Sequence, residues 1–141
     1  MVDNYSIKDV AYFRLGQARE CLRASEALIN TSHYKDAANR SYYSIFHSMR
    51  AVLALDGYDS KKHSGIISEF RKLYIKTGKF DVNFSDTIKD AFDIRTDSDY
   101  QDFYTLSKAE VEQQIENARE FLEAVQKYVD AFAGASVNPT I

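Results

Sequence analysis

One basic and one titratable side chain are spaced to share a helix face within the stretch Tyr34 to Leu55. The stretch contains no Gly or Pro, and its apolar residues recur at steps of three and four, which predicts a helix packed against a core. Arg40 and His47 are seven residues apart, so in a helix they lie within roughly 20° of each other and about 10 Å apart along the axis. Such a pair could act on a phosphate without a metal ion, with Arg40 binding the anion and His47 moving a proton to or from a ribose hydroxyl or a leaving oxygen.

The same residues also fit a purely structural role. Asp36 and Arg40 have the i,i+4 spacing of a surface ion pair, and His47 could lie at the core edge, bonded to Tyr43 or to a neighbouring helix. Tyr43 lies on the same stripe and is a candidate for contact with a nucleotide. Both roles stay open from the sequence alone.

A second candidate phosphate site is the tripeptide Lys62, His63 and Ser64, which stands where a helix is expected to begin. Free N–H groups and the helix dipole favour an anion at such a position. Alternatively, His63 or Ser64 could only cap the helix. The two roles are compatible.

Arg95 is the third candidate, at the start of an acidic, aromatic segment expected to form a loop over 96–105. Arg95 could hold a nucleotide phosphate while Tyr100 stacks on a base, with Asp99 beside them. It could instead anchor the loop to the rest of the protein through Asp97 and Asp99.

Five helices are expected to position these residues, and no segment favours a strand. Capping residues and glycines mark the expected ends of these helices. The expected ranges are Ser6 to Asn30, Tyr34 to Gly57, His63 or Ser64 to Gly78, Ser85 to Arg95, and Ser107 to Gly134. The pattern predicts an all-α, up-and-down antiparallel bundle of four long helices and one short helix, the short one being that after Ser85. Residues 1–133 are expected to form one domain and 134–141 a frayed tail.

Composition limits the classes of function. A net charge of −3 and a pI near 5.6 argue against a protein that coats nucleic acid by bulk charge, although a local basic patch could still hold a phosphate. The amino terminus lacks the pattern of a signal peptide, and no window is apolar enough for a membrane span, so we expect a cytoplasmic protein.

The rarer residue types also guide the expectations. Three histidines without paired spacing and a single cysteine favour neither a metal site nor a cofactor site. Ten tyrosines and nine phenylalanines exceed what a small core needs, which favours a homodimer that covers the excess aromatic surface.

Three segments together resemble a known family: NRSYYSIFH, then Lys62-His63-Ser64-Gly65, then Arg95-Thr-Asp-Ser-Asp99-Tyr100. From roughly Ile7 to Phe132 the chain is similar to the HEPN domain family, in particular to its small stand-alone bacterial and archaeal members. The resemblance implies a helical bundle that works beside RNA or nucleotides. It also implies a partner, because small HEPN proteins often act as toxins silenced by a minimal nucleotidyltransferase, the antitoxin.

Many HEPN ribonucleases carry an Arg and a His separated by four to six residues, and build a composite site from both copies of a dimer. Arg40 and His47 fit this spacing, although the motif usually lies later in the chain, near the position of Arg95. At that later position this sequence has Tyr100 where the catalytic members have His. A tyrosine with a pKa near about 10 is a poor base at neutral pH.

Two main hypotheses follow. The first is a toxin-like protein that cleaves RNA without a metal and leaves a 2′,3′-cyclic phosphate, with His47 as base and Arg40 or Arg95 stabilising the phosphorane. The second, favoured by Tyr100, is a non-catalytic module that binds a nucleotide or a nucleotidyltransferase partner. A purely structural bundle whose polar stripe is an interface is a third.

Overall fold

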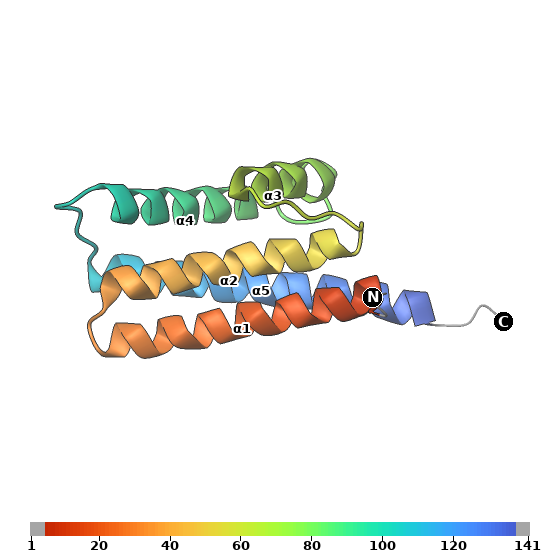
Figure 1. Ribbon diagram of the computed structural model, residues 1–141, viewed down its shortest axis with the longest axis horizontal. Helices are drawn as coiled ribbons and strands as arrows, with labels where there is room; N and C mark the ends of the chain where they lie inside the picture. Colours follow the sequence, from red (N-terminus) through yellow and green to blue (C-terminus); the bar gives the residue numbers. More distant parts are fainter. Residues whose placement is uncertain (1–4, 138–141) are drawn as a thin grey trace.

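The computed structural model describes the backbone of residues 5–137 and side chains as far as Gly134. Within this range the chain is helical without strands, which confirms the predicted all-α class (Figure 1). Five α-helices and one π-helical turn, η1, follow each other in the order α1 (Ile7–Asn30), α2 (Tyr34–Ala54), α3 (His63–Phe70), η1 (Arg71–Ile75), α4 (Asn83–Tyr100) and α5 (Lys108–Val137).

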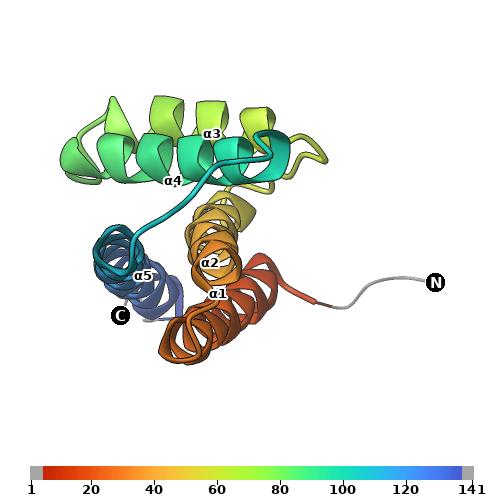
Figure 2. The same cartoon turned by 90° about the vertical axis from the view of Figure 1, so that its left-hand side faces the viewer.

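The helix α2 is the centre of the fold. It packs against α1 and α5 on one side and against α3 and α4 on the other. Figures 1 and 2 show α1, α2 and α5 as a three-helix bundle, and the pair α3 and α4 lying across it on the side of α2. Residues on most of the circumference of α2 are buried, among them Tyr42, Ile45, Met49 and Val52, each with 0% of its surface exposed.

Local signals set several helix ends as the sequence predicted. Ser6 and Asp9 form a reciprocal capping box at the start of α1. Ser107 and Glu110 exchange the same two hydrogen bonds before α5. Gly57 follows α2 with φ of 70°, the left-handed conformation expected of a glycine after a helix.

Other helix ends differ from the predictions. The segment expected to be a loop from residue 96 continues as helix to Tyr100, and α4 begins at Asn83 rather than after Ser85. Residues 96–100 contain no Gly or Pro, and Arg95 and Asp99 form an i,i+4 ion pair that supports a continuing helix. The short helix is therefore α3, with 8 residues, and α4 has 18.

The start of α3 and the end of α5 also differ. Neither His63 nor Ser64 caps α3, because Lys62 occupies the capping position and no side chain bonds there. The helix α5 runs past Gly134 to Val137. The predicted tail falls partly on residues 138–141, which lie outside the described residues.

Candidate functional site

Aromatic rings, two histidines and two arginines gather where one face of α2 meets α3 and α4. We call this group the Tyr43 cluster, and it consists of Arg40, Tyr42, Tyr43, Phe46 and His47 from α2, His63 from α3 and Arg95 from α4. Arg40, Tyr43 and His47 fall on one face because they are spaced by three, four and seven residues. The sequence predicted this stripe, and the fold adds the residues from the other two helices.

Two arginines from different helices converge on Tyr43. The guanidinium carbon of Arg40 lies 5.0 Å from the centre of the Tyr43 ring, and that of Arg95 lies 5.7 Å from it. Arg95 also lies 5.4 Å from the ring centre of Tyr42. These are cation–π distances, so the rings help to hold both guanidinium groups in place.

His47 is half-buried beside this pair. Its ring centre lies 6.1 Å from that of Tyr43 and 5.7 Å from that of Phe46. Its Nδ1 atom is buried and has no hydrogen-bond partner. The structural alternative, a histidine bonded to Tyr43 or to a neighbouring helix through this atom, is therefore absent from the described part of the chain.

The pKa of His47 is lowered from its usual 6.5 to about 4. Burial is the largest cause, because it disfavours the charged imidazolium. The positive charges around the ring add to it, in the order Arg50, Arg40, Arg14 and His63. His47 is therefore neutral at pH 7 in the free protein.

His63 connects the start of α3 to α2. Its ring stacks on Phe46 with centres 4.1 Å apart, and its Nδ1 lies 2.7 Å from the hydroxyl oxygen of Tyr42. Burial lowers the pKa of His63, and the charges of Arg95 and Arg50 lower it further. The residue expected to cap α3 instead packs against α2.

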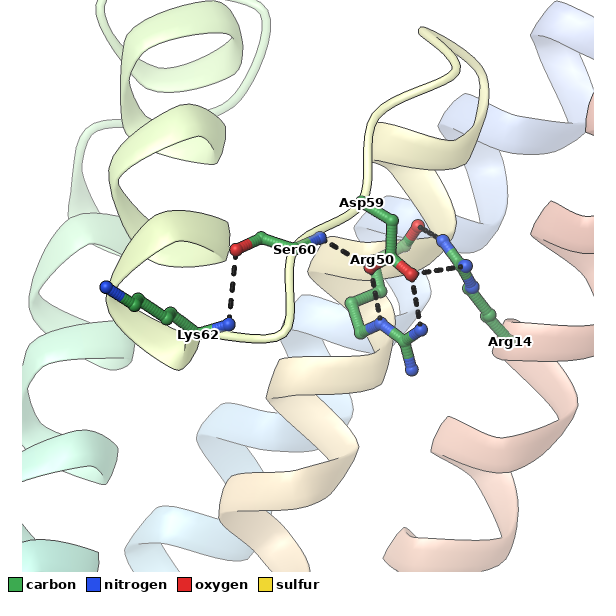
Figure 3. A network of polar contacts seen from close by, with 5 residues as sticks. All are labelled: Arg14, Arg50, Asp59, Ser60 and Lys62. Atoms are coloured by element: carbon green, nitrogen blue, oxygen red, sulfur yellow. Dashed lines mark hydrogen bonds and ion pairs between the residues drawn. The ribbon is translucent and has the colours of Figure 1, made fainter.

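An acidic residue balances part of the positive charge near His47. The carboxylate of Asp59 accepts hydrogen bonds from Arg50 at 3.0 and 3.2 Å and from Arg14 at 3.2 Å (Figure 3). A guanidinium N–H of Arg14 also donates to the backbone oxygen of Arg50 at 3.1 Å. Burial works to raise the pKa of Asp59, but the hydrogen bonds from Arg50 and the Ser60 N–H, together with the charges of Arg14 and Arg50, hold this pKa below its usual value. This network fixes the segment between α2 and α3.

The remaining predicted residues lie apart from the cluster or at its margin. The side chain of Lys62 points away from the Asp59 network (Figure 3), and Ser64 lines a different cavity between α3 and α4. Asp99 pairs with Arg95, its Oδ2 lying 3.4 Å from the Arg95 Nε. Tyr100, at the end of α4, is 83% exposed.

The predicted ion pair between Asp36 and Arg40 does not form within the described residues. Arg40 instead donates a hydrogen bond to the side chain of Asn39 at 3.0 Å and lies over Tyr43. The guanidinium of Arg40 therefore has no carboxylate partner among the described side chains and is available to bind an anion.

Sequence reasoning missed two arginines that shape the charge around His47. Arg50 follows His47 by three residues and would have been found by extending the same helical stripe. Arg14 lies on α1 and is brought to the site only by packing and by Asp59. No local spacing connects it with α2.

The geometry favours binding of a phosphate. Arg40 and Arg95 can each donate two N–H groups to an anion, and the half-buried Tyr43 ring between them can stack on a base. No group of three or more His, Cys, Asp or Glu side chains that could hold a metal ion occurs in the part of the chain that the structure describes. The polar groups of the Tyr43 cluster are those of arginine, imidazole and tyrosine.

Comparison with known proteins gives the family. The HEPN domain model matches residues 11–128. The chain belongs to the HEPN domain family. The match confirms the resemblance inferred from the three sequence segments, and these HEPN helices are the scaffold of the Tyr43 cluster.

Relatives extend over most of this HEPN chain. "Putative toxin MJ0142" of Methanocaldococcus jannaschii is 35% identical over 113 residues, which cover 80% of this chain and 77% of the relative. A "UPF0332 protein" of Thermotoga maritima is 31% identical over 127 residues, which cover 90% of this chain and 96% of the relative. "Putative toxin MJ0605" of M. jannaschii is 29% identical, over 88% of this chain and 92% of the relative.

Between residues 5 and 137, no helix combines the length and the apolar character needed to cross a bilayer.

Proposed function

We propose that this protein is a toxin-like HEPN protein that binds RNA at the Tyr43 cluster and cleaves it without a metal ion. The observation that carries the proposal is the placement of Arg40 and Arg95, from two helices, over one tyrosine ring next to His47. The toxin-like role is supported by the names of two relatives from M. jannaschii, both called putative toxins.

Binding would use the sugar–phosphate backbone and one unstacked base. A phosphate between Arg40 and Arg95 would receive charge-assisted hydrogen bonds from both guanidinium groups. A base of single-stranded RNA would stack on the exposed part of the Tyr43 ring, a contact that tolerates any base. The negative net charge of the chain agrees with such local recognition rather than a broad basic surface.

Cleavage would use the 2′-hydroxyl next to the bound phosphate. As the 2′-oxygen attacks phosphorus, its proton passes to the neutral imidazole of His47. The bond from phosphorus to the 5′-oxygen then breaks, and the leaving oxygen takes a proton from water. The products are a 2′,3′-cyclic phosphate and a 5′-hydroxyl, and the arginines stabilise the charge of the phosphorane.

The low pKa of His47 fits a base that gains strength when substrate binds. In the free protein, burial and three nearby arginines hold the pKa at about 4. A phosphate bound to Arg40 and Arg95 offsets part of this positive charge, and a nearby anion stabilises the imidazolium. The pKa of His47 therefore rises in the complex, which makes the imidazole a better proton acceptor.

A second candidate function is a non-catalytic module that binds a nucleotide or a nucleotidyltransferase partner. The low pKa of His47, about 4, favours this second function. An imidazole with so low a pKa is a weak base unless a bound anion raises the pKa. Under this function, Arg40, Arg95 and Tyr43 bind a ligand while His47 only shapes the pocket. Asp99, Lys62 and Tyr100 would add contacts at the margin.

Two partners belong to the proposal. One is a minimal nucleotidyltransferase that silences the toxin-like chain. The other is a second copy of the chain, supported by apolar side chains on the first half of α1 that face solvent, among them Ile7 at 44% and Phe13 at 68% exposure.

The decisive experiment is incubation of the purified protein with total RNA and with tRNA in EDTA, comparing wild type with His47→Gln. We expect metal-independent fragments with cyclic phosphate ends from wild type, reduced by at least about 100-fold in the variant, since general base catalysis contributes roughly that much or more. His33→Gln is the matched control, because His33 is exposed and precedes α2 at its far end.

Each result decides between the functions. Equal cleavage by wild type and His47→Gln would contradict the assignment of His47 as base. Absence of cleavage together with RNA binding that depends on Arg40 and Arg95 would favour the non-catalytic module. Absence of both would contradict the proposed function altogether.

A further inference from the structure

Two arginines beside the Tyr43 cluster share a single carboxylate. Arg14 on α1 and Arg50 on α2 both bond to Asp59, which lies on the segment between α2 and α3 (Figure 3). Neither arginine pairs with another carboxylate among the described residues. Two positive charges therefore meet one negative charge, and the group as a whole stays positive.

The excess positive charge reaches His47. The charges of Arg50 and Arg14 lower the pKa of His47 even though Asp59 is bonded to both arginines. Positive charge in a partly buried place attracts anions more strongly than charge on an open surface, because water and salt screen it less. The arginine pair is therefore attractive to an anion that arrives from solvent.

The cations of this group are buried more deeply than the anion. The side chain of Arg14 is 13% exposed and that of Arg50 is 22% exposed, whereas that of Asp59 is 46% exposed. Arg14 is also tied to α2, because one of its N–H groups donates to the backbone oxygen of Arg50 at 3.1 Å. The arginines are therefore the fixed part of the group, and the carboxylate is the part that faces solvent.

The segment that carries Asp59 has few bonds to the helices. Residues 59–61 make no backbone-to-backbone hydrogen bond with the part of the chain that the structure describes. The N–H of Ser60 donates to Oδ1 of Asp59 at 2.9 Å, and that of Lys62 donates to the Ser60 hydroxyl at 3.1 Å, so both bonds stay within the segment (Figure 3). Segments with so few backbone bonds open locally at low free energy. Asp59 can therefore move aside while the helices stay folded.

The contacts of Asp59 are those that a phosphate would make. Its carboxylate accepts from Nε and a terminal nitrogen of Arg50 at 3.2 and 3.0 Å, and from Arg14 at 3.2 Å. The fork of a guanidinium group fits the two oxygens of a carboxylate or of a phosphate in the same way. A phosphodiester has two free oxygens and one negative charge, so it can replace the carboxylate one for one.

We propose that Arg14 and Arg50 form a second phosphate subsite for the RNA strand, and that Asp59 occupies and closes this subsite in the free protein. The inference rests on the proposed function, because the strand is the one bound at the Tyr43 cluster. Asp59 acts as an internal competitor, which lowers the affinity for RNA until a phosphate of the strand displaces it.

The position of the subsite sets the kind of strand that can use it. Arg50 follows Arg40 by ten residues on α2, which places their backbones about 15 Å apart along the helix axis, with His47 between them. A single strand of several nucleotides can reach both arginines, whereas a mononucleotide is too short. Asp59 therefore favours longer strands, because only these gain a phosphate contact that compensates for its displacement.

The test is binding of a 2′-O-methylated single-stranded oligonucleotide, measured by fluorescence anisotropy in EDTA with the full-length protein. The methyl group blocks the 2′-oxygen, so the strand stays intact under the proposed mechanism and binding is measured apart from cleavage. Asp59→Asn should bind the strand about tenfold more tightly than wild type, because the competing charge is gone. Asp93→Asn is the matched control. It removes a carboxylate from an exposed ion pair with Lys89 and should stay within about twofold of wild type.

Two further variants connect the gain with the arginines. Most of the gain from Asp59→Asn should be lost when it is combined with Arg50→Gln, because one guanidinium of the subsite is then missing. Arg14→Gln alone should weaken binding by about tenfold, whereas Arg119→Gln should not. Circular dichroism checks that each variant is folded, and Arg14→Gln keeps the proposal testable if Asp59→Asn is not.

Several outcomes would overturn the proposal. Equal affinities of wild type and Asp59→Asn would show that the carboxylate does not compete with RNA. An equal gain in Asp93→Asn would attribute the effect to net charge. Binding that depends on Arg40 and Arg95 but not on Asp59 or Arg14 would remove this inference alone and leave the proposed function intact. Absence of binding by wild type and by every variant would contradict the proposed function as well.

Discussion

The hydroxyl oxygen of Tyr42, in the middle of α2, lies 2.7 Å from Nδ1 of His63, the first residue of α3. Tyr42 is fully buried, so this contact fixes the start of α3 against α2 from inside the protein. It also holds the His63 ring on Phe46 and next to Tyr43. One tertiary contact at the start of α3 therefore sets one edge of the candidate site.

Removal of this hydroxyl should cost stability. Tyr42→Phe leaves Nδ1 of the half-buried His63 without this partner, so we expect the free energy of unfolding in urea to fall by about 1–2 kcal/mol. Tyr43→Phe is the control, because no hydrogen bond of its hydroxyl occurs among the described residues, and it should change the free energy by less than about 0.5 kcal/mol. Equal effects of the two variants would contradict this role for the Tyr42 hydroxyl.

The lowered pKa of His47 predicts a stability that depends on pH. Between pH 6.5 and about 4 the unfolded chain protonates this residue and the folded chain does not. Protons therefore favour the unfolded state, and wild type loses stability as the pH falls through this window. The free energy of unfolding of His47→Gln should therefore fall less over the same pH range than that of wild type. With allowance for solvent screening at a half-buried group, we expect this difference to be about 1–2 kcal/mol.

The measurement is urea unfolding of both proteins at several pH values between 4 and 7. His33→Gln is the matched control, because it removes an exposed histidine that lies outside the Tyr43 cluster. Parallel stability curves for wild type and His47→Gln would show that the pKa of His47 is not lowered in the folded state.

Arg50 should control the basicity of His47. Its charge is the largest electrostatic cause of the lowered pKa, so Arg50→Gln should raise the pKa of His47 above about 4. The pKa can be followed by NMR titration of the imidazole ring protons. Arg119→Gln is the control, since Arg119 pairs with Glu26 and Glu116 instead, and it should leave the pKa of His47 unchanged.

The two arginines over Tyr43 should contribute separately to RNA binding. Arg40→Gln and Arg95→Gln should each weaken binding of a single-stranded oligonucleotide by about tenfold. The slope of log affinity against log salt should become shallower by about 0.7 for each lost phosphate contact. Arg119→Gln is the control, because it removes a positive charge away from the Tyr43 cluster. An equal loss of oligonucleotide affinity in this variant would contradict a localised site.

The exposed apolar surface of α1 should support self-association. Phe13→Ser removes a ring that is 68% exposed. Light scattering should therefore give a lower molar mass for this variant than for wild type, closer to the mass of a single chain. Val82→Ser is the control, because Val82 is 70% exposed but lies on the connector before α4. A wild-type protein with the mass of a single chain would contradict the homodimer.

Local signals made much of the helical architecture predictable. The Ser6 capping box, the left-handed Gly57 and the buried face of α2 each depend on residues within a few positions of one another. The end of α4 was mispredicted because Ser and Asp favour turns as well as helix ends. In residues 96–100 helix continuation prevails, with the Arg95 and Asp99 ion pair as one local support.

The sequence by itself determined the helices and the shared face of Arg40, Tyr43 and His47, because helical periodicity is a property of neighbouring residues. Only the tertiary structure decided that Arg95 and His63 meet this face, and that Arg14 reaches it through Asp59. The same packing places Ser64 at the space between α3 and α4. These placements depend on how helices distant in sequence cross and bury each other, which no spacing along a single helix encodes.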